Sequence, residues 1–181
     1  MGHGAGLNRV PAGIKQSDNA LLEARLAWHL CIMERRPRPI VDLTAHCACG
    51  AVTLTFKGKV KAMFFCACED CQKATGSGHS AAVGAAPEDV AITGETRSFS
   101  RPADSGATYT RMFCPTCGTP ISGISSRAPG LLSLPVGLFG ALAADWYAPT
   151  QMIFARSHRE WDMIDTELPR YQTYRDQEPG R

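Results

Sequence analysis

The chain contains the stretch Cys66-Ala67-Cys68-Glu69-Asp70-Cys71, in which three thiols lie within six residues. One tight loop can therefore offer three sulfurs to a single ion. Zinc sites built from thiolates are closed by four ligands when they are structural and keep an open position when they are catalytic. Three cysteines in one loop therefore fit an open, catalytic site.

Two cysteine pairs flank this stretch. Cys47 and Cys49 are two residues apart, and residues i and i+2 of an extended strand point to the same face. Cys114 and Cys117 form a C-x-x-C knuckle, followed by Gly118 with its permissive backbone. Two such pairs make one tetrahedral four-cysteine site, and a metal there would close a long loop. The sequence thus predicts two Zn²⁺ per chain, a structural ion held by Cys47, Cys49, Cys114 and Cys117 and a catalytic ion held by Cys66, Cys68 and Cys71.

Disulfide bonds are the alternative use of these thiols. The total of eight cysteines is even, so all of them could pair. A bridge within C-x-C is strained, however, and bridges between distant cysteines require an oxidising compartment. Cys31 stands apart from the clusters among Leu30, Ile32 and Met33, and we interpret it as a small buried hydrophobic residue.

Composition indicates an ordinary globular protein. A length of 181 residues favours one domain with a real core, and 44% hydrophobic with 20% charged residues is typical of such domains. No apolar run reaches membrane-spanning length and no secretory signal pattern opens the chain, so we expect a reducing, cytoplasmic setting. Seven thiolates and two Zn²⁺ would change the formal charge of +2 to about −1. Nothing here favours a nucleic-acid or membrane partner.

Three segments are expected along the chain. Residues 1–40 read as an N-terminal extension, partly disordered, with one helix that Ser17 could cap and that ends by Arg36, before Pro37. Residues 41–175 read as the zinc-binding β domain, and residues 176–181 as a tail.

Period-two patterning begins in the second segment. Val52, Leu54 and Phe56 alternate with polar residues, which predicts a strand. Residues 57–59 are interpreted as a turn, after which residues 60–65 return as the second strand of a hairpin that delivers Cys66. A mainly β meander or sandwich pinned by metal is expected. Its further strands are predicted at 80–85, 90–93, 96–99, 107–113, 119–124, 131–136 and 152–155, with a short helix possible at 157–164.

Residues 47–52, 65–77 and 113–120, which carry the three cysteine clusters in order, resemble the glutathione-dependent formaldehyde-activating enzyme family. That family also includes centromere protein V. The resemblance covers about residues 43–171 and is supported by Ile92-Thr93-Gly94 and by the segment 149–161. It implies a small zinc-stapled fold of short antiparallel strands, sometimes called a β-tent. It also implies the same division of the cysteines into a structural and a catalytic zinc site.

An open site of three thiolates leaves one position for water or a substrate thiol, and a coordinating thiol loses its proton. We therefore expect a zinc-dependent carbon–sulfur lyase or thiol adduct synthase, with Cys66, Cys68 and Cys71 as its catalytic residues. The resemblance points to S-hydroxymethylglutathione, formed from formaldehyde and glutathione or a related small thiol. A non-catalytic zinc-binding module and a redox-responsive zinc site are the alternatives. Lys73 could attract a glutathione carboxylate and His79 could relay a proton, although a solvated side chain is the more common role for either.

Overall fold

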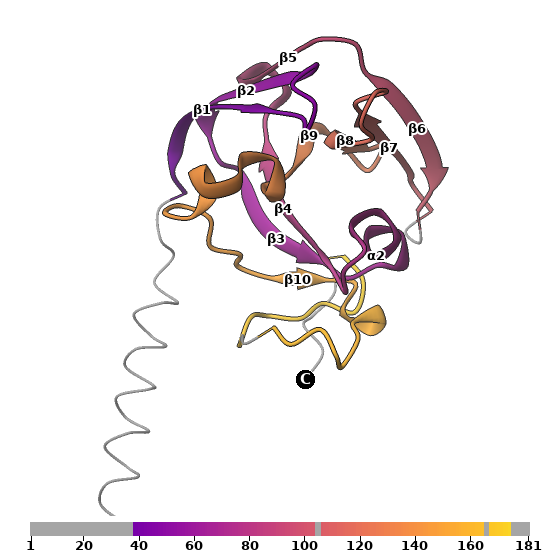
Figure 1. Cartoon of the computed structure of the whole chain (residues 1–181). Helices are drawn as coiled ribbons and strands as arrows, with labels where there is room; N and C mark the ends of the chain where they lie inside the picture. Colours follow the sequence, from indigo (N-terminus) through magenta and orange to yellow (C-terminus); the bar gives the residue numbers. More distant parts are fainter. Residues whose placement is uncertain (1–37, 104–105, 165–166, 175–181) are drawn as a thin grey trace, which may run out of the picture. The chain divides into compact units, whose positions relative to one another are not determined.

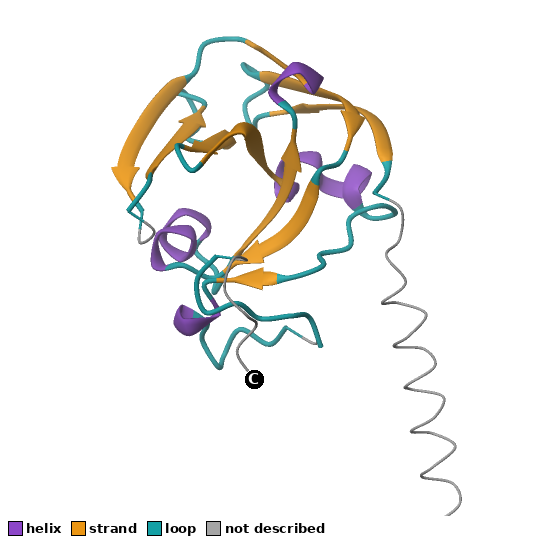
Figure 2. Cartoon of the chain, turned by 180° about the vertical axis from the view of Figure 1, so that it is seen from behind, coloured by secondary structure: helices purple, strands orange, loops and turns teal. Residues whose placement is uncertain are grey.

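The computed structural model describes residues 38–103, 106–164 and 167–174. The helix that is expected to end before Pro37 lies outside these residues, and so does Cys31. The division of the chain into three segments stays a prediction. Most of the regular structure in the described part consists of short, mainly antiparallel strands, which confirms the mainly β fold class. Figure 2 shows the strands in orange with only short helices between them. No helix of this part is long and apolar enough to cross a membrane.

The smaller sheet has three antiparallel strands in the order β1-β2-β5. They are β1 (Ile40–His46), β2 (Thr53–Lys59) and β5 (Val90–Thr93). The predicted alternation holds in β2, because Leu54 and Phe56 are almost fully buried while the residues between them are not. Placing each apolar side chain on the core face is what a period-two strand requires.

The predicted turn and hairpin after Phe56 are wrong. Strand β2 continues to Lys59, which pairs with Ile40 of β1, and the next strand belongs to the other sheet. The chain crosses between the sheets at Val60, which is fully buried and whose amide donates to the Pro39 carbonyl at 2.9 Å. The Lys61 amide then donates to the Gly84 carbonyl of the larger sheet at 2.8 Å.

The larger sheet has seven strands in the order β10-β3-β4-β9-β8-β7-β6 (Figure 1). All neighbours are antiparallel except β10 and β3. Each strand overlaps a stretch that the sequence predicts. The bounds are β3 (Ala62–Cys66), β4 (Ser80–Ala85), β6 (Arg97–Pro102), β7 (Thr108–Phe113), β8 (Pro120–Ser125), β9 (Ala128–Pro135) and β10 (Met152–Ile153).

One main core joins the two sheets. It contains Leu54 and Phe56 from β2, residues of β4, β8 and β9, and Phe139 from the 3₁₀ segment η2 (Val136–Ala143). Full burial of a large apolar side chain contributes about 1.5–3 kcal/mol, so this cluster is the main source of stability apart from any metal. Cys47 and Cys114 belong to the same cluster of buried residues. The group formed by Cys47, Cys49, Cys114 and Cys117 therefore lies at the edge of the core.

The helical segments differ from expectation. Helix α2 (Glu69–Thr75) occupies part of the segment for which the cysteine spacing predicts a tight loop, and the sequence analysis does not predict the 3₁₀ segments η1 (Pro87–Asp89) and η2. The helix expected at 157–164 is wrong, because only the 3₁₀ turn η3 (Ala155–Ser157) forms and the chain then follows an irregular loop. Signals for α2 were present: acidic residues in its first turn and Gly76 as a left-handed C-cap at φ 67°.

Candidate metal centres and active site

The first cysteine group combines two turns from different sheets. Cys47 and Cys49 lie between β1 and β2, whereas Cys114 and Cys117 lie between β7 and β8. Their four sulfurs all lie within 4.8 Å of one another, with Sγ distances of 3.5 Å from Cys47 to Cys49 and 3.7 Å from Cys49 to Cys114. A tetrahedral zinc with Zn–S bonds near 2.3 Å would separate its sulfurs by about 3.8 Å. The donor set and the spacing therefore fit a zinc ion and not a disulfide.

In both turns of this group, the amide of a glycine that follows the second cysteine donates to the carbonyl of the first cysteine. The Gly50 amide donates to the Cys47 carbonyl, and the Gly118 amide donates to the Cys114 carbonyl, both at 2.9 Å. Both glycines have positive φ, 78° and 73°, which residues with a Cβ rarely adopt. The expected role of Gly118 is thus confirmed, but the placement of Cys47 and Cys49 in a strand is wrong. A tight turn, not strand alternation, brings their sulfurs together.

Hydrogen bonds prepare this group for a cation. The Val52 amide donates to the Cys47 sulfur at 3.2 Å. A hydrogen bond from the Thr119 hydroxyl, 3.1 Å from the sulfur, lowers the pKa of Cys117 to about 5. Donors aimed at sulfur favour the thiolate, which is the form that binds metal.

The second cysteine group lies at a strand-to-helix corner. Cys66 ends β3, Cys68 is the residue before α2, and Cys71 lies in the first turn of α2. Their sulfurs all lie within 4.8 Å of one another. Among the residues that the structure describes, no fourth Cys, His, Asp or Glu side chain joins them. Within the described part of the chain, the group could therefore offer three sulfurs to a metal ion.

The corner is fixed on both sides. Cys66 pairs with Ser80 of β4 and with Ile153 of β10, and the Ala67 amide donates to the Ile153 carbonyl at 3.0 Å. Cys66 and Cys68 are almost fully buried. Pairing with two strands fixes the backbone position of Cys66.

The three thiols of this group have different pKa values. Hydrogen bonds from Cys66 and Cys71 lower the pKa of Cys68 to about 2, while the hydrogen bond to Cys68 raises the pKa of Cys66. The positive charge of Arg101 adds to the lowering at Cys68. These hydrogen bonds favour the thiolate form of Cys68, which is the form that binds metal.

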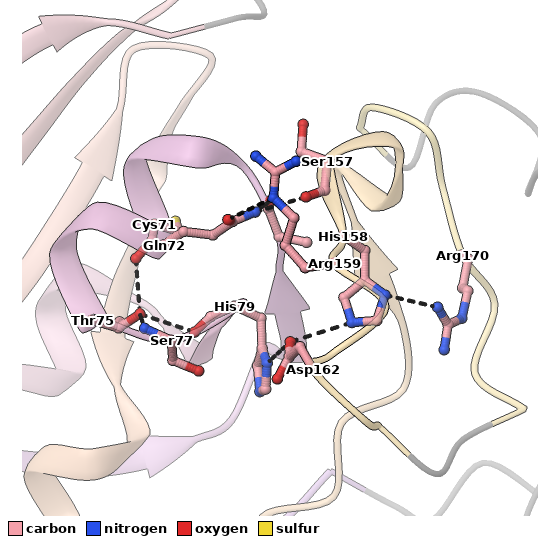
Figure 3. A network of polar contacts seen from close by, with 11 residues as sticks. Cys71, Gln72, Thr75, Ser77, His79, Ser157, His158, Arg159, Asp162 and Arg170 are labelled. Atoms are coloured by element: carbon pink, nitrogen blue, oxygen red, sulfur yellow. Dashed lines mark hydrogen bonds and ion pairs between the residues drawn. The ribbon is translucent and has the colours of Figure 1, made fainter.

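Helix α2 is tied to the C-terminal loop by Gln72 (Figure 3). Its amide nitrogen donates to the carbonyls of Ala67 and Ser157, both at 2.7 Å. Its amide oxygen accepts from the Arg159 guanidinium at 3.3 Å. One side chain therefore links the cysteine corner, the helix and the loop.

His79 takes part in a second tie that sequence reasoning missed (Figure 3). Its Nδ1 lies 2.7 Å from Asp162 Oδ2, and His158 Nε2 lies 3.2 Å from the same oxygen. All three side chains are less than one-fifth exposed. His79 is therefore not the solvated histidine considered from the sequence. It anchors the start of β4 to the loop after η3.

Asp162→Ala is expected to lower the free energy of unfolding by about 1–3 kcal/mol, because the largely buried His79 imidazole loses the carboxylate that is hydrogen-bonded to its Nδ1. Urea denaturation of the zinc-loaded protein measures the change. Glu160→Ala, an exposed residue of the same loop, is the matched control and should change stability by less than about 0.5 kcal/mol. Equal free energies of unfolding for the two variants would show that the contact between His79 and Asp162 does not stabilise the fold.

The stretch of chain that carries both cysteine groups matches a known protein family. The model of the glutathione-dependent formaldehyde-activating enzyme family matches residues 42–157, which include all seven cysteines of the two groups. The chain belongs to this family. Membership confirms the resemblance noted in the cysteine motifs. It connects the protein in general terms with activation of formaldehyde by glutathione.

The other comparisons add less. A crystal structure of a Rhodobacter sphaeroides protein is 18% identical and covers 55% of this chain and 89% of that one, with a TM-score of 0.44. None of the curated proteins matches the chain. The assignment to the glutathione-dependent formaldehyde-activating enzyme family therefore rests on the family match.

Proposed function

We propose that the protein is a carbon–sulfur lyase or thiol adduct synthase that forms or cleaves S-hydroxymethylglutathione or a related small-thiol adduct. The observation that carries this proposal is the unequal division of the sulfurs. Four cysteines form a complete ligand set, whereas Cys66, Cys68 and Cys71 form an incomplete one. We assign a structural zinc to the first group and a catalytic zinc to the second. Family membership supports the choice of glutathione and formaldehyde.

The catalytic zinc would supply an electrophilic position at which a substrate thiol is held deprotonated. The chain's own residues do the rest. The paired backbone of β3, β4 and β10 holds Cys66 in place, and the burial of Cys66 and Cys68 would limit water around the metal that they would bind. Arg101 contributes a positive charge that favours anionic sulfur, and charges act more strongly away from bulk water.

The reaction balances without a redox partner. The substrate sulfur donates an electron pair to the carbonyl carbon of formaldehyde, a C–S bond forms and the C=O π bond breaks. The oxygen takes up the proton that the thiol released, which gives a hydroxymethyl thioether. Cleavage is the reverse of this sequence. A reducing, cytoplasmic setting fits the proposal, because all the described cysteines are free thiols.

Exchange spectroscopy with ¹³C-formaldehyde and glutathione tests the proposal. The zinc-loaded protein is expected to accelerate interconversion of formaldehyde hydrate and S-hydroxymethylglutathione well beyond the spontaneous rate in the same buffer. Zinc sulfate at matched concentration is the control for free metal. An unchanged exchange rate with glutathione, cysteine and related thiols alike would favour a non-catalytic zinc module.

A further inference from the structure

Resting on the proposed function, we propose that a cationic pocket beside the three-cysteine group binds a carboxylate of the thiol substrate, so that the enzyme selects acidic thiols. The pocket has a volume of about 240 Å³. Lys73 and Arg111, which line it, are the residues that would hold the carboxylate.

The pocket lies between helix α2 and one face of the β6–β7 hairpin. Phe99 is opposite Arg111, and Arg101 is opposite Tyr109, in the register of that hairpin. Because side chains two residues apart share a face of a strand, these four point to the same side. Helix α2 contributes Asp70 and Lys73, three residues apart and hence on one side of the helix, to the opposite wall.

Positive charge exceeds negative charge in the lining. Arg101, Arg111 and Lys73 face a single carboxylate, that of Asp70. Arg101 already forms an ion pair with Asp70 at 2.6 Å and lies over the Tyr109 ring, 5.5 Å from its centre. Among the described residues, no carboxylate is paired with Lys73 or Arg111, so their charges remain for an incoming anion. A guanidinium can bind a carboxylate through two parallel hydrogen bonds.

Several contacts place this pocket next to the sulfurs. Asp70, which lines the pocket and pairs with Arg101, directly precedes Cys71 on α2, and Lys73 follows Cys71 by two residues.

The size of the pocket limits what it can hold. Pockets for drug-sized ligands measure about 300–1,000 Å³, so 240 Å³ suits one end of a small peptide and not the whole of it. A peptide thiol could place a carboxylate here while its sulfur reaches the cysteines.

Calorimetry with S-methylglutathione and its diamide tests the proposal independently of turnover. The methyl group blocks the sulfur, and amidation replaces the carboxylates with neutral groups of the same shape. The unmodified protein is expected to bind the diacid about tenfold more tightly than the diamide, because charge-assisted hydrogen bonds are lost in the diamide. In the double variant Lys73→Gln, Arg111→Gln this ratio should fall to about one.

Arg97→Gln with Lys59→Gln is the matched control, since it removes the same two charge types from exposed positions outside the pocket. Its diacid preference should remain about tenfold. If the double variant misfolds, Lys73→Gln alone tests the same point, because Lys73 is at an exposed helix position. This single substitution should lower the preference for the diacid about threefold.

Equal binding of diacid and diamide by the unmodified protein, or no binding of either, would overturn the subsite. A preference of about tenfold for the diacid, if it persists in both the double variant and Lys73→Gln alone, would also overturn the subsite. If the preference depends on the pocket but no adduct exchange occurs, the subsite stands and the proposed reaction fails.

Discussion

Cys117→Ser is expected to leave the protein largely unfolded. The four-cysteine group connects a turn of the smaller sheet to a turn of the larger one, so its loss removes a link between the two. Cys117 itself is exposed, and the substitution therefore removes a ligand without creating a core cavity. Structural zinc sites bind with about 10–16 kcal/mol in peptides, which is as large as the roughly 5–15 kcal/mol by which a native domain is stable. Circular dichroism and zinc content would record the loss.

Cys31→Ser is the control for this variant, because Cys31 stands apart from the three cysteine clusters in the sequence. It should keep the zinc content and the melting temperature of the unmodified protein. A Cys117→Ser protein that melts cooperatively at the same temperature would contradict a structural role for the four-cysteine group.

Cys68→Ser is expected to have the opposite profile, with little change in fold and a large loss of activity. The two sheets keep their four-cysteine link, while the corner between β3 and α2 loses one of three ligands. We expect one zinc fewer per chain and adduct exchange at least about a hundredfold slower, equivalent to about 2.7 kcal/mol of activation free energy. Metal analysis, circular dichroism and ¹³C exchange measure these effects together.

Comparison with Cys117→Ser supplies the control for Cys68→Ser, since both replace one proposed ligand by the same residue. If Cys68→Ser unfolds the protein as fully as Cys117→Ser does, the division into a structural and a catalytic metal is wrong. Unimpaired exchange in a folded Cys68→Ser protein would remove the three-cysteine group from the reaction.

The cysteine clusters could be predicted from sequence because the spacing within each cluster is local, and the two distant pairs could be joined because four thiols complete a tetrahedral site. Thiols two or three residues apart must lie close in any tight turn, so the pairing did not depend on the exact backbone. Most strands were predicted for the same reason, since alternation is a property of neighbouring residues. Gly58 shows the limit. It looked like a turn residue, but it lies inside β2, where the Asp89 side chain occupies the space that a Cβ would need.

The rest of the candidate site depends on contacts between distant residues. Arg101 and Arg111 line the same pocket as residues of α2 only because of the register between β6 and β7 and the position of α2 against them. Asp162 meets His79 across 83 residues of sequence. No pattern within either segment indicates its partner, so spacing rules cannot find these residues.

The central claim is that one chain holds a closed metal site and an open site that accepts a thiol. Cadmium-113 NMR of the ¹¹³Cd-substituted protein tests it most directly, because the shift of each ion reports its own ligands. We predict two resonances, of which only the one that Cys68→Ser abolishes moves when glutathione is added. Two resonances that both stay fixed under excess glutathione, or one resonance for the whole chain, would contradict the claim.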